Sequence, residues 1–315
     1  MQNFNNMKHF INLKDISAKD LRKILVDAKK RKADRKNLNH LQADKGAPLK
    51  GKLLIQMFEK SSLRTRLSFY LAIKQLGGGT LTLRSNELHL GEGGESIADT
   101  AKILSTYGDG FMLRTDSDIK IENFKKYITI PIINGLSPFS HPTQILSDIF
   151  TVEEIKNKPV SKLNIAWIGD SNNVLNSLIS ASVKFNFKLS IGCPKNYQPN
   201  KSLLSWAKKT NKKIYICHDS KKAVFNADII FSDKVISLND KVNKKKKLSD
   251  FKKFRITQKL LSYAKKDCSF LHCLPRGNEV DEKVFFSKKS KVWQQALNRV
   301  HVQKSILLYC FGKLR

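Results

Sequence analysis

Short runs of apolar residues alternate with longer amphipathic segments along the first half of the chain. The apolar runs predict strands at residues 53–58, 80–83, 111–113 and 130–133. Apolar side chains at helical spacing predict helices at 17–28, up to residue 76, at 96–107, at 121–127 and from residue 142 onwards. Such alternation is typical of a parallel sheet with helices on its faces, an α/β domain.

The second half of the chain repeats this alternation. Its apolar runs predict strands at 163–168, 189–192, 214–217, 228–231 and 269–274. Helices are predicted at 174–185, 201–210, 221–225, 252–265 and 300–311. We therefore expect two doubly wound parallel-sheet domains, the first covering residues 1–150 and the second residues 151–295.

Polar residues gather where the predicted strands end. They are found at 59–66, 114, 134–141, 169–173, 233 and 272–276. In open parallel sheets, ligands bind beyond the carboxyl ends of the strands. The pattern thus predicts an active site in a cleft between the domains, with an anion on one wall and a second substrate on the other.

The anion is predicted from the turn that follows the first of these strands. Ser62, Arg64, Thr65 and Arg66 lie at the start of a predicted helix. The first backbone N–H groups of a helix have no partner within it, and the positive end of the helix dipole lies behind them. Hydroxyl and guanidinium groups at this place complete a receptor for a phosphate or a similar dianion.

The composition limits the class of protein. With 315 residues, of which 41% are hydrophobic, the chain is long enough for two globular domains, and no apolar run reaches the length of a membrane span. The first residues lack the apolar core of a signal peptide, so we expect a cytoplasmic protein with no membrane partner. Five cysteines without a C-x-x-C pair argue against a disulfide framework and a structural zinc site.

The net charge of +31 comes from lysines that are spread along the chain. A nucleic-acid binder concentrates its basic residues in one region with interleaved aromatics. The dense run at 241–247 is interpreted as a solvated loop before a helix that starts at Ser249. A lysine-rich surface is therefore favoured over a nucleic-acid partner, and its field draws small polyanions towards a site.

Six motifs, in the same order along the chain, resemble those of the aspartate/ornithine carbamoyltransferase family. They lie at 58–69, 89–96, 131–136, 141–144, 272–275 and 298–299. The resemblance covers nearly the whole chain, and within the family it fits the ornithine-acting members best.

This resemblance implies a homotrimer with active sites near the subunit interfaces. Carbamoyl phosphate binds to the first domain, and the uncharged δ-amine of L-ornithine then attacks it to give L-citrulline and phosphate, a step of arginine biosynthesis or degradation. The reaction needs fixed positive charge, hydrogen-bond donors and close positioning of two reactants, so we expect no cofactor and no metal. A closing helix, at about 296–315, is implied to return to the first domain.

The resemblance also assigns roles to single residues. Carbamoyl phosphate is assigned to Ser62, Leu63, Arg64, Thr65, Arg114, His141, Gln144, Cys273, Leu274 and Arg299. Leu63 acts through its backbone N–H, and Leu274 through its backbone carbonyl, which accepts from the carbamoyl nitrogen. Catalysis is assigned to Arg114, His141, Cys273 and Arg299.

Ornithine is assigned to the second domain. The resemblance implies contacts from Asn173, Asp233, Ser237 and Leu238. Asp233 and Asn173 hold the α-amino and carboxylate end, and Asp233 with the thiolate of Cys273 helps to remove the proton of the δ-amine. Asn86 is a further candidate from the loop that reaches a neighbouring subunit's site.

Two positions depart from the pattern of ornithine-acting members. Leu63 stands where they have threonine, and residues 237–239 read Ser-Leu-Asn instead of Ser-Met-Gly. Leu63 is similar to carbamoyltransferases of N-acylated ornithines, so these substrates stay as an alternative. Aspartate is disfavoured because the segment after Phe231 has no arginine to hold a dicarboxylate. A basic nucleic-acid-binding protein on the same fold is the remote alternative.

Overall fold

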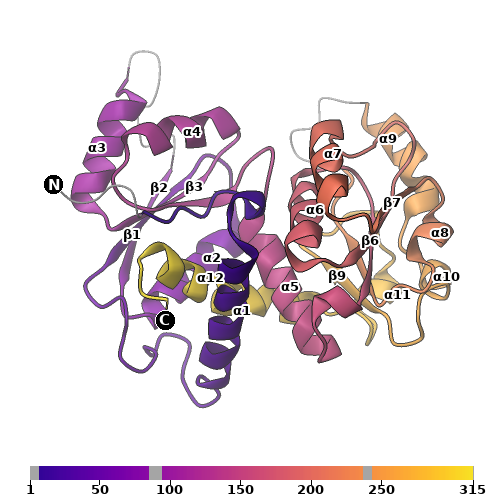
Figure 1. The fold of residues 1–315 in the computed structure, drawn as a ribbon, viewed down its shortest axis with the longest axis horizontal. Coiled ribbons are helices and arrows are strands. Elements are labelled where there is room, and N and C mark those ends of the chain that lie inside the picture. Colours follow the sequence, from indigo (N-terminus) through magenta and orange to yellow (C-terminus); the bar gives the residue numbers. More distant parts are fainter. Residues whose placement is uncertain (1–6, 85–93, 237–242, 315) are drawn as a thin grey trace. The chain divides into compact units, whose positions relative to one another are not determined.

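A computed structural model describes residues 7–84, 94–236 and 243–314 of the protein (Figure 1). The chain divides into two compact units. The first unit comprises 1–147 and 297–315, and the second comprises 148–296. Within the described part of the chain, no helix has the length and apolar composition that crossing a bilayer requires.

The first unit is built on a four-stranded parallel sheet. Its strands are β1 (Leu53–Phe58), β2 (Gly79–Arg84), β3 (Gly110–Arg114) and β4 (Ile132–Leu136), in the order β2-β1-β3-β4. The helices within this unit are α1 (Ala18–Ala33), α2 (Leu63–Gln75), α3 (Ile97–Tyr107) and α4 (Asp118–Tyr127). Phe10 adds a parallel bridge to Ile133 at the β4 edge.

Sequence and structure agree closely at the start of these elements. Ser17 caps α1 by accepting from the N–H of Asp20 at 3.0 Å, as its capping position predicts. Strand β1 is buried at every residue after Leu53, because both faces of a parallel sheet are covered. Ile55 and Phe111 of neighbouring strands pack with Phe124 of α4 in one apolar core.

The second unit is built on a five-stranded parallel sheet. Its strands are β5 (Asn164–Ile168), β6 (Lys188–Gly192), β7 (Ile214–Cys217), β8 (Ile229–Ser232) and β9 (Ser269–His272), in the order β7-β6-β5-β8-β9. Its helices include α6 (Asn173–Phe185), α7 (Lys201–Thr210), α8 (Ser220–Val224), α9 (Lys244–Phe251), α10 (Gln258–Leu261) and α11 (Glu282–Phe285). The predicted α/β class with two parallel sheets is confirmed.

The remaining two helices contribute residues to both units. Helix α5 (Pro142–Lys156) contains the boundary between residues 147 and 148, and α12 (Val292–Cys310) contains the boundary between 296 and 297. Helix α12 begins earlier than the predicted 300–311. The prediction missed its first turns because they carry buried polar residues such as Gln295 and Asn298, which weaken the apolar pattern.

The predicted start of a helix at Ser249, after the lysine run, is wrong. Helix α9 already begins at Lys244, and the side chain of Asn243 caps it by accepting from the N–H of Lys246 at 3.2 Å. Lys247 is 4% exposed, and its Nζ lies 2.6 Å from Oδ2 of Asp170. A long apolar stem with one carboxylate partner can enter a core, and counting charges along the sequence does not reveal that partner.

The predicted helix at 252–265 is also wrong. A short 3-10 turn occupies Lys252–Phe254, and α10 covers only Gln258–Leu261. Between them, Ile256 pairs with Val280 in a parallel bridge, and Thr257 caps α10 by accepting from the N–H of Leu260 at 3.0 Å. A pairing to a distant segment therefore overrides the local helical spacing here.

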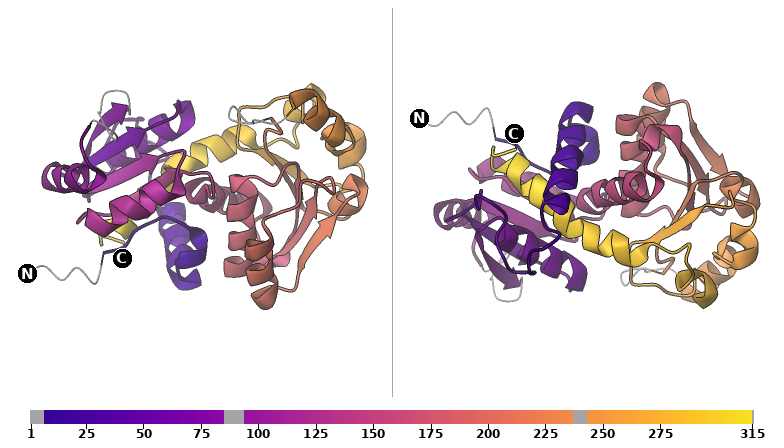
Figure 2. Two further views of the ribbon diagram at one scale, coloured as in Figure 1. Left: turned by 90° about the horizontal axis from the view of Figure 1, so that it is seen from above. Right: turned by 90° about the horizontal axis from the view of Figure 1, so that it is seen from below.

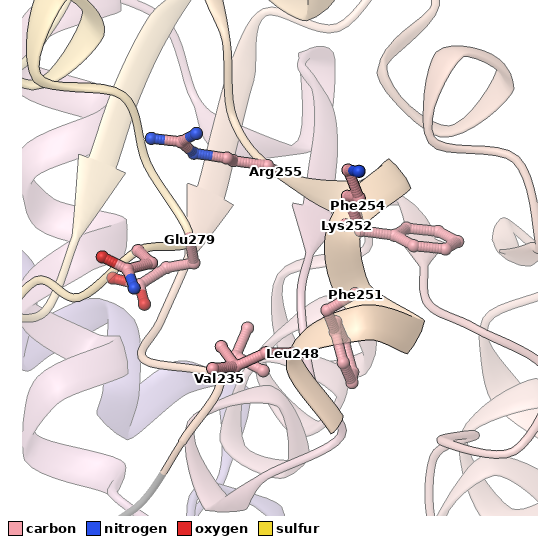
Figure 3. A pocket seen from close by; sticks show the side chains of 8 residues that line it. Val235, Leu248, Phe251, Lys252, Phe254, Arg255 and Glu279 are labelled. Carbon is pink, nitrogen blue, oxygen red and sulfur yellow. The ribbon is translucent and has the colours of Figure 1, made fainter. Parts of the chain in front are cut away.

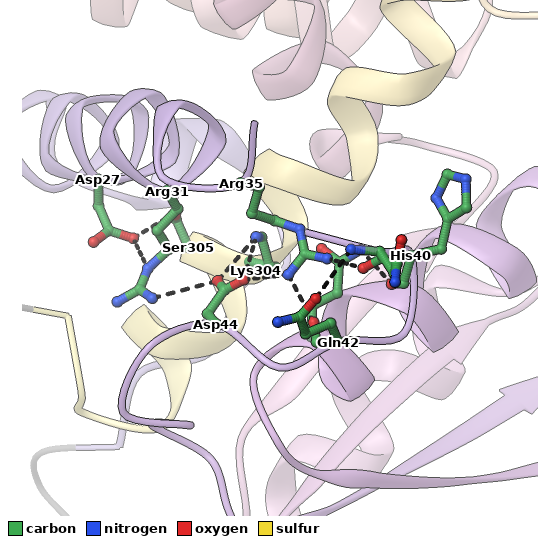
Figure 4. Close-up of polar contacts among 10 residues, drawn as sticks. Asp27, Arg31, Arg35, His40, Gln42, Asp44, Lys304 and Ser305 are labelled. Atoms are coloured by element: carbon green, nitrogen blue, oxygen red, sulfur yellow. Dashed lines mark hydrogen bonds and ion pairs between the residues drawn. The ribbon is translucent and has the colours of Figure 1, made fainter. Parts of the chain in front are cut away.

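In the first unit, α12 lies beside α1 (Figure 2). A buried ion cluster joins α12 to α1 and to the loop after it (Figure 4). Asp44 accepts from Lys304 Nζ at 2.9 Å and from Arg35 Nη1 at 2.6 Å, and Arg31 Nη1 lies 3.6 Å away. Ser305 donates to Asp27 at 2.6 Å. Burial, only partly opposed by Asp44, lowers the pKa of Lys304 to about 8.

Candidate active site in two sets of residues

The order of each sheet marks one place where ligand binding is expected. In the first sheet the strand order reverses between β1 and β3, and in the second between β5 and β8. The connections that leave such a pair run in opposite directions, which opens a crevice at the carboxyl ends of the strands. Arg114 is the last residue of β3, and the segments after β1, β5 and β8 contain Thr65, Asn172 and Asp233.

The first set of residues is centred on the hydroxyl of Thr65, which lies in the first turn of α2. Thr65 is 1% exposed, and its Oγ1 accepts from Arg299 Nη2 at 2.8 Å and from Arg114 Nη1 at 3.4 Å. Nη1 of Arg299 donates to Oε1 of Gln144. Four of the predicted residues, drawn from α2, β3, α5 and α12, are thus joined in one hydrogen-bonded group.

His141 lies in the electrostatic field of this group. It is 4% exposed, and its pKa is held well below its usual value. Burial is the main cause, and the charges of Arg299, Arg114 and Arg64 lower it further. His141 is therefore neutral at physiological pH, with one ring N–H to donate. The same cationic field that disfavours an imidazolium favours an anion.

The start of α2 leaves backbone donors for that anion. Ser62 is the N-cap residue in an extended conformation, with φ −154°, and its side chain makes no cap hydrogen bond within the described residues. Leu63 is the first helical residue, and its side chain is 70% exposed. The leucine that departs from the family pattern therefore leaves the backbone N–H groups of this turn in the helical geometry that suits a phosphate.

Two neighbouring segments brace the first set. Asn134 is fully buried, and its Nδ2 donates to the Ile11 carbonyl and to the hydroxyls of Ser137 and Ser140, which shapes the loop leading to His141. The N–H of Glu59 donates to the Arg114 carbonyl at 3.0 Å. The ends of β1 and β3 are therefore held side by side.

The second set of residues is centred on the carboxylate of Asp233. Its Oδ1 accepts from Cys273 Sγ at 2.9 Å, and its Oδ2 accepts from Asn172 Nδ2 at 2.7 Å. Asp233 and Cys273, which the sequence predicted, therefore lie together. Because the thiol hydrogen is directed at the carboxylate, Cys273 is a donor in this arrangement.

The sequence did not predict a role for Asn172 at the site. Asn172 caps α6, since its Oδ1 accepts from Val174 N at 3.0 Å and from Leu175 N at 3.1 Å. Its amide nitrogen is thereby aimed at Asp233. An asparagine just before a helix is a recognisable N-cap signal, but the predicted helix at 174–185 started one residue late, so this signal pointed to Asn173 instead of Asn172.

The other predicted residues of the second set have different positions. Asn173 is the first residue of α6, and Leu274 follows β9 with a left-handed backbone, φ 59°. The Leu274–Pro275 peptide bond is cis. Ser237, Leu238 and Asn86 lie outside the described residues.

A separate cavity of about 300 Å³ lies in the second unit (Figure 3). It is lined by apolar side chains, including Val235 and Phe251, and by the charged side chains of Arg255 and Glu279. Among the described residues, its lining includes none of those assigned to ornithine. In the same described ranges, no group of three histidine, cysteine or acidic side chains is placed to hold a metal ion.

Comparison with known proteins decides the family. The model of the carbamoyl-P binding domain of aspartate/ornithine carbamoyltransferases matches residues 8–154, and the model of the Asp/Orn binding domain matches 161–310. The chain belongs to the aspartate/ornithine carbamoyltransferase family. Both halves of the family architecture are therefore present.

Individual family members are similar over their whole lengths. An ornithine carbamoyltransferase of Agrobacterium fabrum is 40% identical over 307 residues, which cover 97% of this chain and 98% of that protein. Among solved structures, the ornithine carbamoyltransferase of Pyrococcus furiosus has a TM-score of 0.91 at 37% identity, covering 97% of each chain. The anabolic ornithine carbamoyltransferase of Campylobacter jejuni has a TM-score of 0.88 at 35% identity, covering 98% of this chain and 100% of that one.

Proposed function

We propose that this protein transfers the carbamoyl group of carbamoyl phosphate to the δ-amino group of L-ornithine, giving L-citrulline and phosphate in arginine biosynthesis. The observation that carries the proposal is the group around Thr65, where Arg114, Arg299 and neutral His141 converge beside the start of α2. Family membership and the full-length relatives named ornithine carbamoyltransferases support the same assignment.

The first set of residues suits the electrophile. Thr65 Oγ1 accepts from two arginines, so its own hydrogen remains to be donated to the substrate. Arg64, Arg114 and the N–H groups of α2 are assigned to the phosphate. His141 and Thr65 are assigned to the carbonyl oxygen, where negative charge develops as the amine attacks. Fixed donors at such a place stabilise the transition state, and each contributes about 3 kcal/mol.

The second set suits the nucleophile. The carboxylate of Asp233 is held on both oxygens, by Cys273 and by Asn172, so its position is fixed before a substrate arrives. We assign Asp233 and Asn173 to the α-amino and carboxylate end of ornithine, with Ser237 and Leu238 alongside. The δ-amine reacts in its uncharged form, so turnover is expected to rise with pH as this amine loses its proton.

Leucine at position 63 favours one alternative substrate class. Its exposed side chain removes the hydroxyl that ornithine-acting members carry at the phosphate turn, as in carbamoyltransferases of N-acylated ornithines. We keep N-acylornithine as the second candidate for this reason. A homotrimer with active sites near its subunit interfaces, in the cytoplasm, is part of the same proposal.

One experiment tests the assignment directly. Purified protein is supplied with carbamoyl phosphate and, in parallel, with ornithine, N-acetylornithine, N-succinylornithine, putrescine or aspartate, and the ureido product and phosphate are measured. We expect ornithine to be used with the highest kcat/KM. Turnover of an acylated ornithine with no citrulline formed would replace the substrate assignment, and inactivity with every amine would remove the enzymatic proposal altogether.

A further inference from the structure

The segment after β9 is held by a chain of hydrogen bonds that starts at a buried carboxylate. Oε1 of Glu279 accepts from His272 Nε2 at 3.1 Å and from the N–H of Gly277 at 2.5 Å. Nδ1 of His272 accepts from the N–H of Leu274 at 3.0 Å. Glu279 and His272 are both buried, and hydrogen bonds are stronger in such surroundings than in water.

This geometry fixes the tautomer of His272. The backbone N–H of Leu274 can only donate, so Nδ1 must carry a lone pair and the ring proton must reside on Nε2. Nε2–H then donates to Glu279, which accepts best when ionised. Burial is the largest influence on the pKa of Glu279 and raises it, but the hydrogen bonds from His272 and Gly277 outweigh burial and leave the pKa below its usual value.

Both ends of this chain of hydrogen bonds are anchored to the rest of the second unit. The N–H of His272 donates to Oε1 of Gln295 at 2.9 Å, and Gln295 in turn donates to Asp148 at 2.8 Å. The carbonyl of Glu279 accepts from the N–H of Ile256 at 2.8 Å. The imidazole and the carboxylate are therefore fixed relative to the sheet, and Leu274 takes its orientation from them.

Leu274 needs such an anchor because of its backbone. A φ of 59° lies in the left-handed region, which a leucine rarely adopts. Conformations of this kind persist only where the surroundings hold them. The hydrogen bond from the N–H of Leu274 to His272 is one contact that does so.

We propose that His272 and Glu279 are positioning residues of the transfer reaction, acting through the backbone of Leu274 and the thiol of Cys273. This inference rests on the proposed function, in which the Leu274 carbonyl accepts from the carbamoyl nitrogen. Cys273 lies between the two residues that this chain of hydrogen bonds joins, and its Sγ contacts Asp233. Glu279 and His272 thus orient one group for each substrate without touching either.

Two substitutions at His272 separate positioning from packing. His272→Asn keeps an acceptor at the place of Nδ1, whereas His272→Gln reaches only the place of Nε2 although it is closer to histidine in volume. If orientation of Leu274 matters, His272→Gln lowers kcat by about 10- to 100-fold, and His272→Asn retains clearly more activity. KM for ornithine changes little in either variant. A glutamine variant as active as the asparagine variant, or more active, would show that the side chain only fills space.

Matched variants at two nearby glutamates provide the second arm. Glu279→Ala removes the acceptor of His272, while Glu279→Gln keeps an oxygen there and should recover much of the lost kcat. Glu282, whose side chain is 75% exposed, lies 3.6 Å from Arg276, and serves as the control. Its Ala and Gln variants should resemble the unmodified protein. Equal losses in all four variants would overturn the proposal.

A spectroscopic measurement keeps the proposal testable if a variant fails to fold. Long-range ¹⁵N spectra of the histidine-labelled protein, assigned with His272→Asn, report which ring nitrogen carries the proton. We expect Nε2–H in the unmodified protein, and a proton on Nδ1 would overturn this inference alone. Absence of citrulline formation by the unmodified protein would instead overturn the proposed function, so the two failures are distinguishable.

Discussion

The two sets of site residues differ in how their charge is arranged. Around Thr65, cationic side chains from two separate elements, β3 and α12, meet at one hydroxyl, and burial keeps the nearby His141 neutral. Around Asp233, a single carboxylate is held by a thiol and an amide. The first arrangement suits an anionic leaving group, and the second suits an amino group. Under the proposed function, the sign of the fixed charge separates the two substrates, with the anion at the Thr65 group and the amine at Asp233.

The largest expected effect tests the cationic set. Arg299→Ala removes one guanidinium that contacts both Thr65 and Gln144, so kcat/KM for carbamoyl phosphate should fall by about 10³-fold. Arg299→Lys keeps the charge but not the two-pronged contact, and should recover only part of the loss. Steady-state kinetics measure both. A loss below tenfold in the alanine variant would remove Arg299 from the site.

A smaller effect is expected at the carboxylate. Asp233→Asn removes the negative charge while keeping a side chain of the same shape, so KM for ornithine should rise by about 100-fold. Binding of carbamoyl phosphate, measured by calorimetry, should be unchanged, because the charge acts only on the amine. Equal weakening of both substrates would contradict the division of charge between the two sets.

The side chain of Asn172 both caps α6 and contacts Asp233, and two substitutions separate these roles. Asn172→Asp keeps the cap of α6 but places a second carboxylate against Asp233, so kcat/KM for ornithine should fall by about tenfold, and any loss of stability should come from carboxylate repulsion and disappear at acidic pH. Asn172→Ala loses the cap as well and should also lower the free energy of unfolding by about 1 kcal/mol. Urea unfolding and kinetics on the same samples distinguish them. Unchanged activity in the aspartate variant would leave Asn172 as a cap alone.

The smallest effect on activity is expected at the ion cluster that supports the first set. Lys304 lies in α12 beyond Arg299, and its pKa of about 8 in the folded protein compares with 10.5 when unperturbed. Between these two pH values the unfolded chain binds a proton that the folded protein has lost, so this group makes stability rise with pH by up to about 3 kcal/mol.

Lys304→Met should remove that rise. Urea unfolding between pH 7 and about pH 10 measures the slope, and the exposed Lys23 of α1, changed to Met, gives the control. The same slope in both variants would mean that Lys304 does not change its protonation in this range. Activity at pH 7 should change little, since the lysine contacts no residue of the Thr65 group in the described part of the chain.

The sequence predicted regular elements best where a short apolar run has abrupt polar ends. β1 (Leu53–Phe58) and β7 (Ile214–Cys217) have the predicted bounds. Prediction failed where a distant partner decides the local structure, as with Lys247 on Asp170 and Ile256 beside Val280. Such partners lie far away in the sequence, and periodicity does not reveal them.

The same contrast holds at the site. Thr65 and Arg114 lie at strand ends that chemistry and family resemblance both mark, Arg299 in α12 is marked by the resemblance alone, and the structure brings the three together. Asn172 and Glu279 act through the orientation of a neighbouring group. That orientation depends on the contact from Asn172 to Asp233 and on the tautomer of His272, and residue types alone predict neither.

The neutral His141 lies in the positive field of three arginines of the first unit. A dianion among these arginines would cancel much of their field, but it would relieve only the electrostatic part of the shift in the pKa of His141, because burial, the larger cause, remains. The imidazole would then stay neutral with the anion bound and keep one ring N–H to donate. Through this residue, binding would take up no proton, and the heat of binding would not depend on the ionisation enthalpy of the buffer.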